Sequence, residues 1–218
     1  MRTFSNALAF AALLLSTPAF AQAAPAATKV GKPAKQPWLY EGSDVPVDDT
    51  WTFGVLPNGV RYAVKKNDVP AGQVSIRVRI DAGALHENND EQGFAHLIEH
   101  LSFRGSTFVP DGEAKRIWQR FGVTFGSDSN AQTTPTQTVY KLDLPNATPE
   151  KLDESVKIIS GMIRNPRISP TALNAERAIV LAELRENSGA QMIYSDALRQ
   201  HAFQGQRLAS RSTIGTPE

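Results

Sequence analysis

The sequence predicts an α+β fold in which helices cover one face of a mostly antiparallel sheet. Two observations predict this fold. Short segments with alternating apolar residues come in pairs joined by turn residues, as in antiparallel hairpins. Longer segments that begin with helix-capping residues lie between and after these pairs. Together the patterns occupy residues 51–218, a length that suffices for one such core.

The first expected strands lie between residues 52 and 80. Residues 52–56 and 60–66 flank the turn sequence Pro-Asn-Gly and predict a hairpin. From residue 74 to residue 80, Val and Ile alternate with polar residues, which predicts a third strand with one buried face. These strands precede the first expected helix.

The first helix is expected to begin at Asn89. Gln92 follows three residues later, where it can complete a capping box, and Asp90 and Glu91 favour the positive end of a helix dipole. The apolar residues that follow would bury one side of this helix. Polar groups on it would therefore be held on a packed element.

The remaining elements follow in the same way. The sequence predicts a helix over residues 112–121, a strand pair around residue 130 and over residues 138–144, and a helix over residues 149–163. Ser169 followed by Pro170 marks the start of another helix. No internal repeat is found.

The chemistry of the first helix lies in the sequence His96-Leu97-Ile98-Glu99-His100. Successive residues of an α-helix are about 100° apart around its axis, so His96 and His100 lie within roughly 40° and can reach one metal ion. Glu99 lies about 100° from His100, where it can reach a water on the metal. The H-x-x-E-H pattern therefore predicts a catalytic zinc ion with Glu99 as general base.

A third ligand is expected to be a carboxylate, because the chain has no cysteine and only His86 and His201 besides the motif. The segment NAERAIVLAELREN offers Glu176 and Glu183, which are seven residues apart and fall within about 20° on a helix. Its apolar residues would bury these acids in part, and buried acids need a partner. Either glutamate could serve.

Three separated motifs, GFAHLIEHLSFRGS, SNAQTTPTQTVY and ERAIVLAE, together with the hairpin LPNGVRYAV, resemble the pitrilysin/insulinase family of zinc metallopeptidases. The resemblance runs from about residue 55 to residue 218 and implies the N-terminal domain of a zinc-dependent endopeptidase. It implies one zinc ion per chain, a peptide or small protein as substrate, and a second homologous domain or chain that completes the site. Family members usually contain two to four such domains, so this chain is expected to be a truncated first domain with weak activity alone.

Carried onto this sequence, the resemblance makes His96, His100 and Glu183 the zinc ligands and Glu99 the base. Glu176 would support a ligand without contacting the zinc itself. The gap from His100 to Glu183 is a few residues longer than is common in the family. Counting residues from His100 alone would therefore favour Glu176 as the ligand. The local motif favours Glu183, with the extra length placed in residues 121–129.

The resemblance also gives a role to Asn130 and Ala131. In relatives this segment is an edge strand beside the zinc, where a substrate pairs as an added strand, and Pro135 suits such an edge. Asn130 and Ala131 are therefore expected to contact substrate. The alternative is an ordinary exposed strand. Tyr140 alternates with apolar residues and is expected in the core.

The N-terminus predicts export. Arg2, an apolar run over residues 7–15 and a small-x-small site at residues 19–21 indicate a signal peptide over residues 1–21, and hence a periplasmic or secreted protein. Residues 22–50 form an Ala/Pro/Lys-rich tether, and residues 51–218 the zinc-peptidase domain. The apolar run is too short for a stable membrane span, which takes about 20 residues.

Charge adds little to the choice of partner. The net charge is +1 and becomes 0 without residues 1–21, because Arg2 is the one charge there, so nothing favours nucleic acid. Two alternatives remain open, a non-catalytic structural or peptide-binding subunit of the same fold and a zinc-binding protein without activity. The intact set of His96, Glu99, His100 and Glu183 argues against the first. Glu99, which sits where a base is required, argues against the second.

Overall fold

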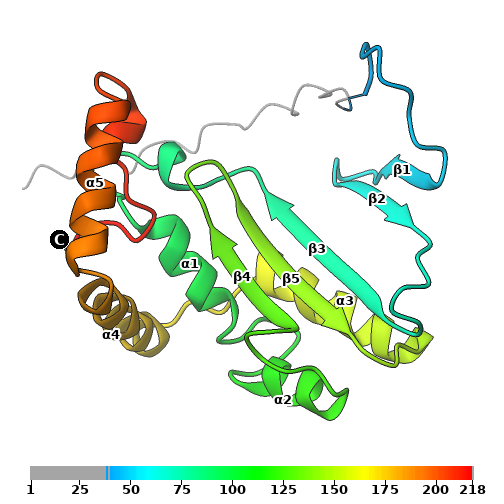
Figure 1. The fold of residues 1–218 in the computed structure, drawn as a ribbon. Helices are drawn as coiled ribbons and strands as arrows, with labels where there is room; N and C mark the ends of the chain where they lie inside the picture. The colour runs from blue at the N-terminus through cyan, green and yellow to red at the C-terminus, as the bar shows by residue number, and fades with distance from the viewer. Residues whose placement is uncertain (1–37, 39, 218) are drawn as a thin grey trace, which may run out of the picture. The chain divides into compact units, whose positions relative to one another are not determined.

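The computed structural model describes Trp38 and residues 40–217 (Figure 1). The expected signal peptide and most of the tether lie outside the described residues. The chain divides into two compact units between Lys66 and Asn67. Each unit is described by itself below.

The described part of the first unit contains one hairpin. Strands β1 (Trp51–Val55) and β2 (Arg61–Lys65) are antiparallel, with Trp51 opposite Lys65. The turn between them is closed by a bond from the Leu56 amide to the Val60 carbonyl, and Gly59 has a φ of +90°, which favours glycine. The hairpin expected from the Pro-Asn-Gly turn is thereby confirmed.

The second unit is built on a three-stranded antiparallel sheet. Its strands are β3 (Val74–Ile80), β4 (Ser129–Thr133) and β5 (Thr138–Leu144), in the order β3-β5-β4. Tyr140 of central β5 lies opposite Val78 on one side and Ala131 on the other. Strand β4 therefore has one edge that no described strand pairs.

Helices cover one face of this sheet (Figure 1). The unit contains α1 (Phe94–Ser102), α2 (Glu113–Arg120), α3 (Pro149–Arg164), α4 (Pro170–Glu186) and α5 (Ala190–Ala202). Helices α1, α2 and α3 pack against the sheet, and α4 packs against α1. The core joins β5 to α2 and α3 through Tyr140, Leu142, Leu144, Ile117, Trp118, Ile158, Ile159 and Met162. The α+β architecture and the core position of Tyr140 are confirmed. As expected, the Ser169 side chain caps α4, whose first residue is Pro170.

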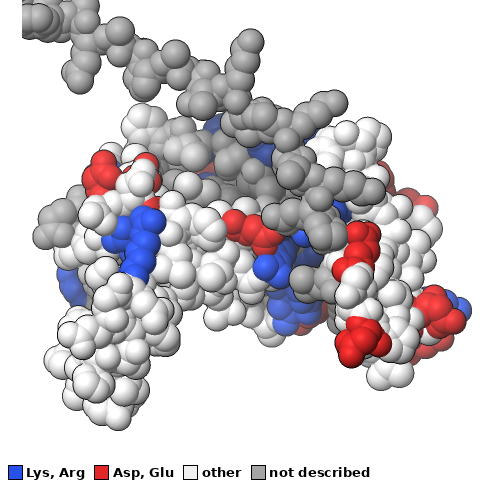
Figure 2. All heavy atoms as spheres, turned by 90° about the horizontal axis from the view of Figure 1, so that it is seen from above, with Lys and Arg blue, Asp and Glu red and all other residues white. Residues whose placement is uncertain are grey.

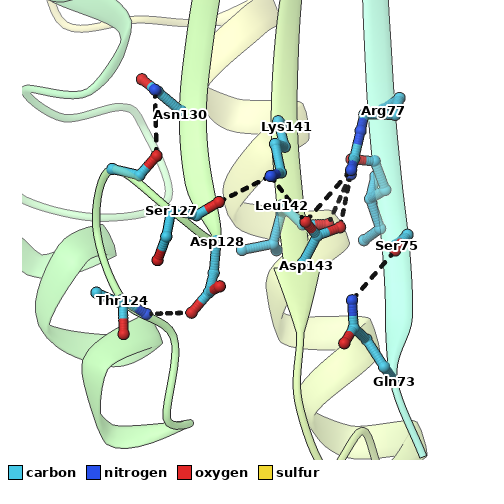
Figure 3. A network of polar contacts seen from close by, with 12 residues as sticks. Gln73, Ser75, Arg77, Thr124, Ser127, Asp128, Asn130, Lys141, Leu142 and Asp143 are labelled. Carbon is cyan, nitrogen blue, oxygen red and sulfur yellow. Dashed lines mark hydrogen bonds and ion pairs between the residues drawn. The ribbon is translucent and has the colours of Figure 1, made fainter. Parts of the chain in front are cut away.

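The other face of the sheet carries charged side chains (Figure 3). Arg77 and Lys141 contact the two carboxylate oxygens of Asp143 at 2.8 and 3.0 Å. Burial alone would raise the pKa of Asp143, but hydrogen bonds from Arg77, Ser75 and Lys141 lower it to about 2. On the face drawn in Figure 2, acidic and basic side chains both occur, in keeping with the net charge of +1.

The start of α1 differs from the expectation. The helix begins at Phe94, and the residues around Asn89 form turns. The cap comes from Glu87, whose buried carboxylate accepts bonds from the amides of Gly93 at 2.9 Å and Ala95 at 2.7 Å. Gly93 has a φ of +97°, which sets the helix entry at this residue. A carboxylate from before the turn thus replaces the expected capping box at Asn89.

Two further features had no expectation, helix α5 and the segment that follows it. Arg211 is buried and donates to the Asn89 side chain at 2.6 Å and to the Glu87 carbonyl at 3.3 Å. Gly215 packs against Gly93 so closely that a side chain on either would meet backbone. The C-terminal segment therefore packs against the entry of α1. No described helix has the length and apolarity that a membrane span requires.

Candidate metal centre

Helices α1 and α4 bring three potential metal ligands together. His96 and His100 stand on one face of α1, with ring centroids 4.8 Å apart. The Oε2 atom of Glu183, on α4, lies 3.7 Å from the Nε2 atom of each histidine. The ligand atoms of these three residues all lie within 4.8 Å of one another. Two sequence segments about 80 residues apart thus converge at one point.

The three side chains suit a catalytic zinc ion. Two imidazole nitrogens and one carboxylate oxygen form a common donor set of zinc peptidases, and they leave a fourth position for water or substrate. The Nε2 atoms of His96 and His100 face the same Glu183 oxygen, so small movements of the side chains would let all three contact one ion. The donor set therefore fits zinc.

The protonation of His96 also favours a metal. Burial, followed by the charge of neighbouring His100, lowers the pKa of His96 below its usual value, against the opposing effects of Glu183 and Glu99. A lowered pKa keeps the ring neutral at neutral pH. Only a neutral imidazole has the lone pair with which a metal bonds.

The structure places the two candidate glutamates on different sides of His100. Buried Glu176 contacts Nδ1 of His100 at 3.1 Å through one oxygen, and its other oxygen accepts a bond from Arg104 at 2.6 Å. Glu183 instead faces Nε2 of both histidines. An Nδ1 hydrogen shared with Glu176 leaves the lone pair of His100 on Nε2, the nitrogen directed toward Glu183.

Glu99 lies beside these ligands on α1. Its side chain is buried, and its Oε2 atom accepts a hydrogen bond of 2.5 Å from the hydroxyl of Thr133 on β4. A buried carboxylate requires such a partner. The contact between Thr133 and Glu99 was not predicted, because the two residues are 34 positions apart and no spacing rule links a helix to a strand.

An open cavity of about 380 Å³ adjoins the site. Asn130 and Ala131 line it beside the histidines, and the amide group of Asn130 donates to the Gly126 carbonyl at 3.2 Å. Sequence reasoning missed several other lining residues, namely Gln132, Thr133, Asn187, Met192, Ser212, Thr213 and Ile214. Gln132, Thr133 and Asn187 lie in or beside the motif segments but were given no role, and Met192, Ser212, Thr213 and Ile214 come from segments without a motif. Only the fold brings all of them to the cavity.

Comparison with known proteins settles the family. The family model described as insulinase (peptidase family M16) matches residues 62–216. The match covers more than half of the 218 residues and includes every residue of the metal centre. This chain belongs to the insulinase family. The resemblance noted in the sequence is thereby confirmed.

Relatives within the insulinase family show which part of a longer protein this chain matches. A Haemophilus influenzae protein named probable zinc protease PqqL is 32% identical over 177 residues, which are 81% of this chain and 19% of that protein. The crystal structure of the periplasmic protease PqqL from Escherichia coli matches with a TM-score of 0.76 and 30% identity, over 79% of this chain and 19% of that one. A structure of the first half of the same protease matches with an equal TM-score over 37% of its length. The chain thus spans about a fifth of these full-length relatives.

Proposed function

We propose that this chain supplies the zinc site and the catalytic base of an endopeptidase. The observation that carries the proposal is the convergence of His96, His100 and Glu183 beside a buried Glu99. A protein that only stores zinc has no use for a carboxylate held beside the ligands. The zinc-protease names of its relatives support a peptidase function in general.

In this proposal His96, His100 and Glu183 hold the ion, and Glu176 orients the ring of His100. Bound zinc supplies an acidic water and polarises the carbonyl of the peptide bond. Glu99 takes a proton from the attacking water as the C–O bond forms. It then gives that proton to the amide nitrogen as the C–N bond breaks, so it ends the cycle unchanged.

The substrate is proposed to bind along β4. This strand has an edge that no described strand pairs, and its residues Asn130 and Ala131 line the cavity at the metal centre. An extended peptide added to this edge would form backbone hydrogen bonds whatever its sequence. The peptide bond would then run past the ligands and Glu99.

Two further parts of the proposal rest on relatives. The match to the first half of the PqqL protease supports a second homologous domain or chain that completes the active site. The name of the Escherichia coli relative, a periplasmic protease, supports the periplasm as the location. The signal peptide expected over residues 1–21 agrees with that location.

The decisive test is Glu99→Gln in the full-length protein. We expect native mass spectrometry to find one zinc ion per chain in both forms, while cleavage of a quenched fluorescent peptide falls by about 100- to 10,000-fold in the variant. Exposed Glu186, at the end of α4, provides the control Glu186→Gln, which should cleave normally.

Two other results would redirect the proposal. A full-length protein that folds without zinc would point to a non-catalytic subunit of this fold. A protein that binds zinc but cleaves no peptide, with or without Glu99, would point to zinc binding as its function.

A further inference from the structure

The carboxylate of Glu99 is held by one hydrogen bond from a different element. Its side chain is buried on α1, and the Oε2 atom lies 2.5 Å from the Thr133 hydroxyl. Within the described residues its other oxygen, Oε1, accepts no hydrogen bond. The contact with Thr133 therefore fixes one oxygen and leaves the second free.

The direction of this hydrogen bond follows from the neighbours of Thr133. Thr138 lies opposite Thr133 in the sheet and donates its hydroxyl proton to the Ala82 carbonyl at 3.0 Å, since a carbonyl can only accept. Thr138 can therefore only accept from Thr133, and that distance is 3.4 Å. The single proton of Thr133 is thus directed to Glu99, which is nearer and charged.

The position of Thr133 in the chain adds a second consequence. Thr133 ends strand β4, the strand whose residues Asn130 and Ala131 line the cavity. A peptide added to β4 would take its register from the backbone of that strand. The hydrogen bond from the Thr133 hydroxyl thus connects strand β4 to the carboxylate of Glu99, the proposed base.

We propose that Thr133 is a positioning residue, which fixes the Oε2 atom of Glu99 so that its Oε1 atom is aimed at the attacking water. This inference rests on the proposed role of Glu99 as the base. In this role Thr133 would act through Glu99, by way of the hydrogen bond from its hydroxyl, and not on the reacting atoms themselves. Without it, the carboxylate would rotate and lose its alignment with a peptide bound on β4.

The first test measures the link without reference to activity. In the full-length protein, Thr133→Val should lower Tm by about 2 to 6 °C, because it leaves a buried carboxylate unpaired. In a Glu99→Ala background the same change should leave Tm within about 1 °C. Equal losses in both backgrounds would overturn the inference, because they would assign Thr133 a packing role only.

The second test measures peptide cleavage. Thr133→Val should lower kcat about 10- to 100-fold with KM unchanged, and Thr133→Ser, which keeps the hydroxyl, should restore most of the rate. Thr136→Val is the matched control, since Thr136 is an exposed threonine in the turn after β4. Equal rates for the valine and serine variants at position 133 would overturn the inference.

The two proposals can fail separately. A zinc-loaded wild-type protein that cleaves no peptide would overturn the proposed function, and the Tm comparison would then decide alone whether Thr133 holds Glu99. A wild-type protein that is active, beside an equally active Thr133→Val variant, would overturn the inference and leave the proposed function standing.

Discussion

Glu176 and Glu183 lie on the same helix and approach opposite nitrogens of one ring. Glu176 contacts Nδ1 of His100 at 3.1 Å, whereas Glu183 lies 3.7 Å from its Nε2. Their spacing of seven residues on α4 brings both acids to one face, so helix spacing left their roles open and only the family motif favoured Glu183 as the ligand. The ring of His100 separates them, because only one of its nitrogens is directed toward His96 and Glu183.

Zinc affinity should therefore fall by different amounts in the two glutamate variants. Glu176→Gln should weaken zinc binding about 10- to 100-fold, which is the usual effect of removing the hydrogen-bond partner of a metal ligand. Glu183→Gln should weaken it more, because it removes a carboxylate charge at the ion. Competition with a zinc chelator measures both, and Glu186→Gln is the control. A larger loss for Glu176→Gln would assign the ligand role to Glu176.

The cap of α1 should contribute measurably to stability. Glu87→Ala should lower the free energy of unfolding by about 2 kcal/mol, because the amides of Gly93 and Ala95 lose a buried acceptor. Urea unfolding measures the change. Asp90→Ala, in the same loop and exposed, should have little effect. The opposite ranking would contradict Glu87 as the cap of α1.

Acid should lower the free energy of unfolding through Asp143, on the charged face of the sheet, as the pH falls below about 4. The pKa of Asp143 is held at about 2, below its unfolded value, so the charged form stabilises the fold above pH about 4. Asp143→Asn should cost about 1 kcal/mol at pH 7 after allowance for solvent screening. The difference from wild type should shrink as the pH falls below about 4 and vanish only below the folded-state pKa of about 2. A gap that stays constant with pH would contradict this account.

Alkali should act through Tyr140. Burial and the nearby charge of Glu99 raise the pKa of its phenol, with an opposing contribution from the bond to Ser102 at 3.0 Å. A raised pKa stabilises the fold below pH about 10, and this stability is lost at higher pH. In an alkaline titration, Tyr140→Phe should remove the tyrosine absorbance change that occurs at the highest pH. The same change should lower the free energy of unfolding by about 1 kcal/mol at pH 7. An unchanged titration would place Tyr140 in water.

Local sequence rules predicted the elements of this fold that depend on neighbouring residues. The period of the H-x-x-E-H motif places His96 and His100 on one face, and the Pro-Asn-Gly turn sets the first hairpin. The start of α4 followed from Ser169 and Pro170. Each of these signals acts within a few residues.

The contacts that sequence reasoning missed join residues that no local spacing rule connects. Glu87 replaces the cap expected at Asn89. The backbone turns between Glu87 and Phe94, and this turn brings the Glu87 carboxylate to the first amides of α1. Thr133 reaches Glu99 from another element, and Arg211 reaches the same region from the end of the chain. Only the folded chain brings these partners together, since they come from a strand, a turn and the C-terminal segment.

The sparse packing of α4 has a consequence for the whole unit. Only Ala172 and Glu176 of this helix are buried, yet Glu183 near its end belongs to the candidate metal centre. An ion shared with His100 would close a chain loop that includes α2, β4, β5 and α3, so it would act as a reversible crosslink on the unfolded chain. Metal occupancy would then govern how often α4 detaches, and the rate at which an added protease cuts this helix would report it.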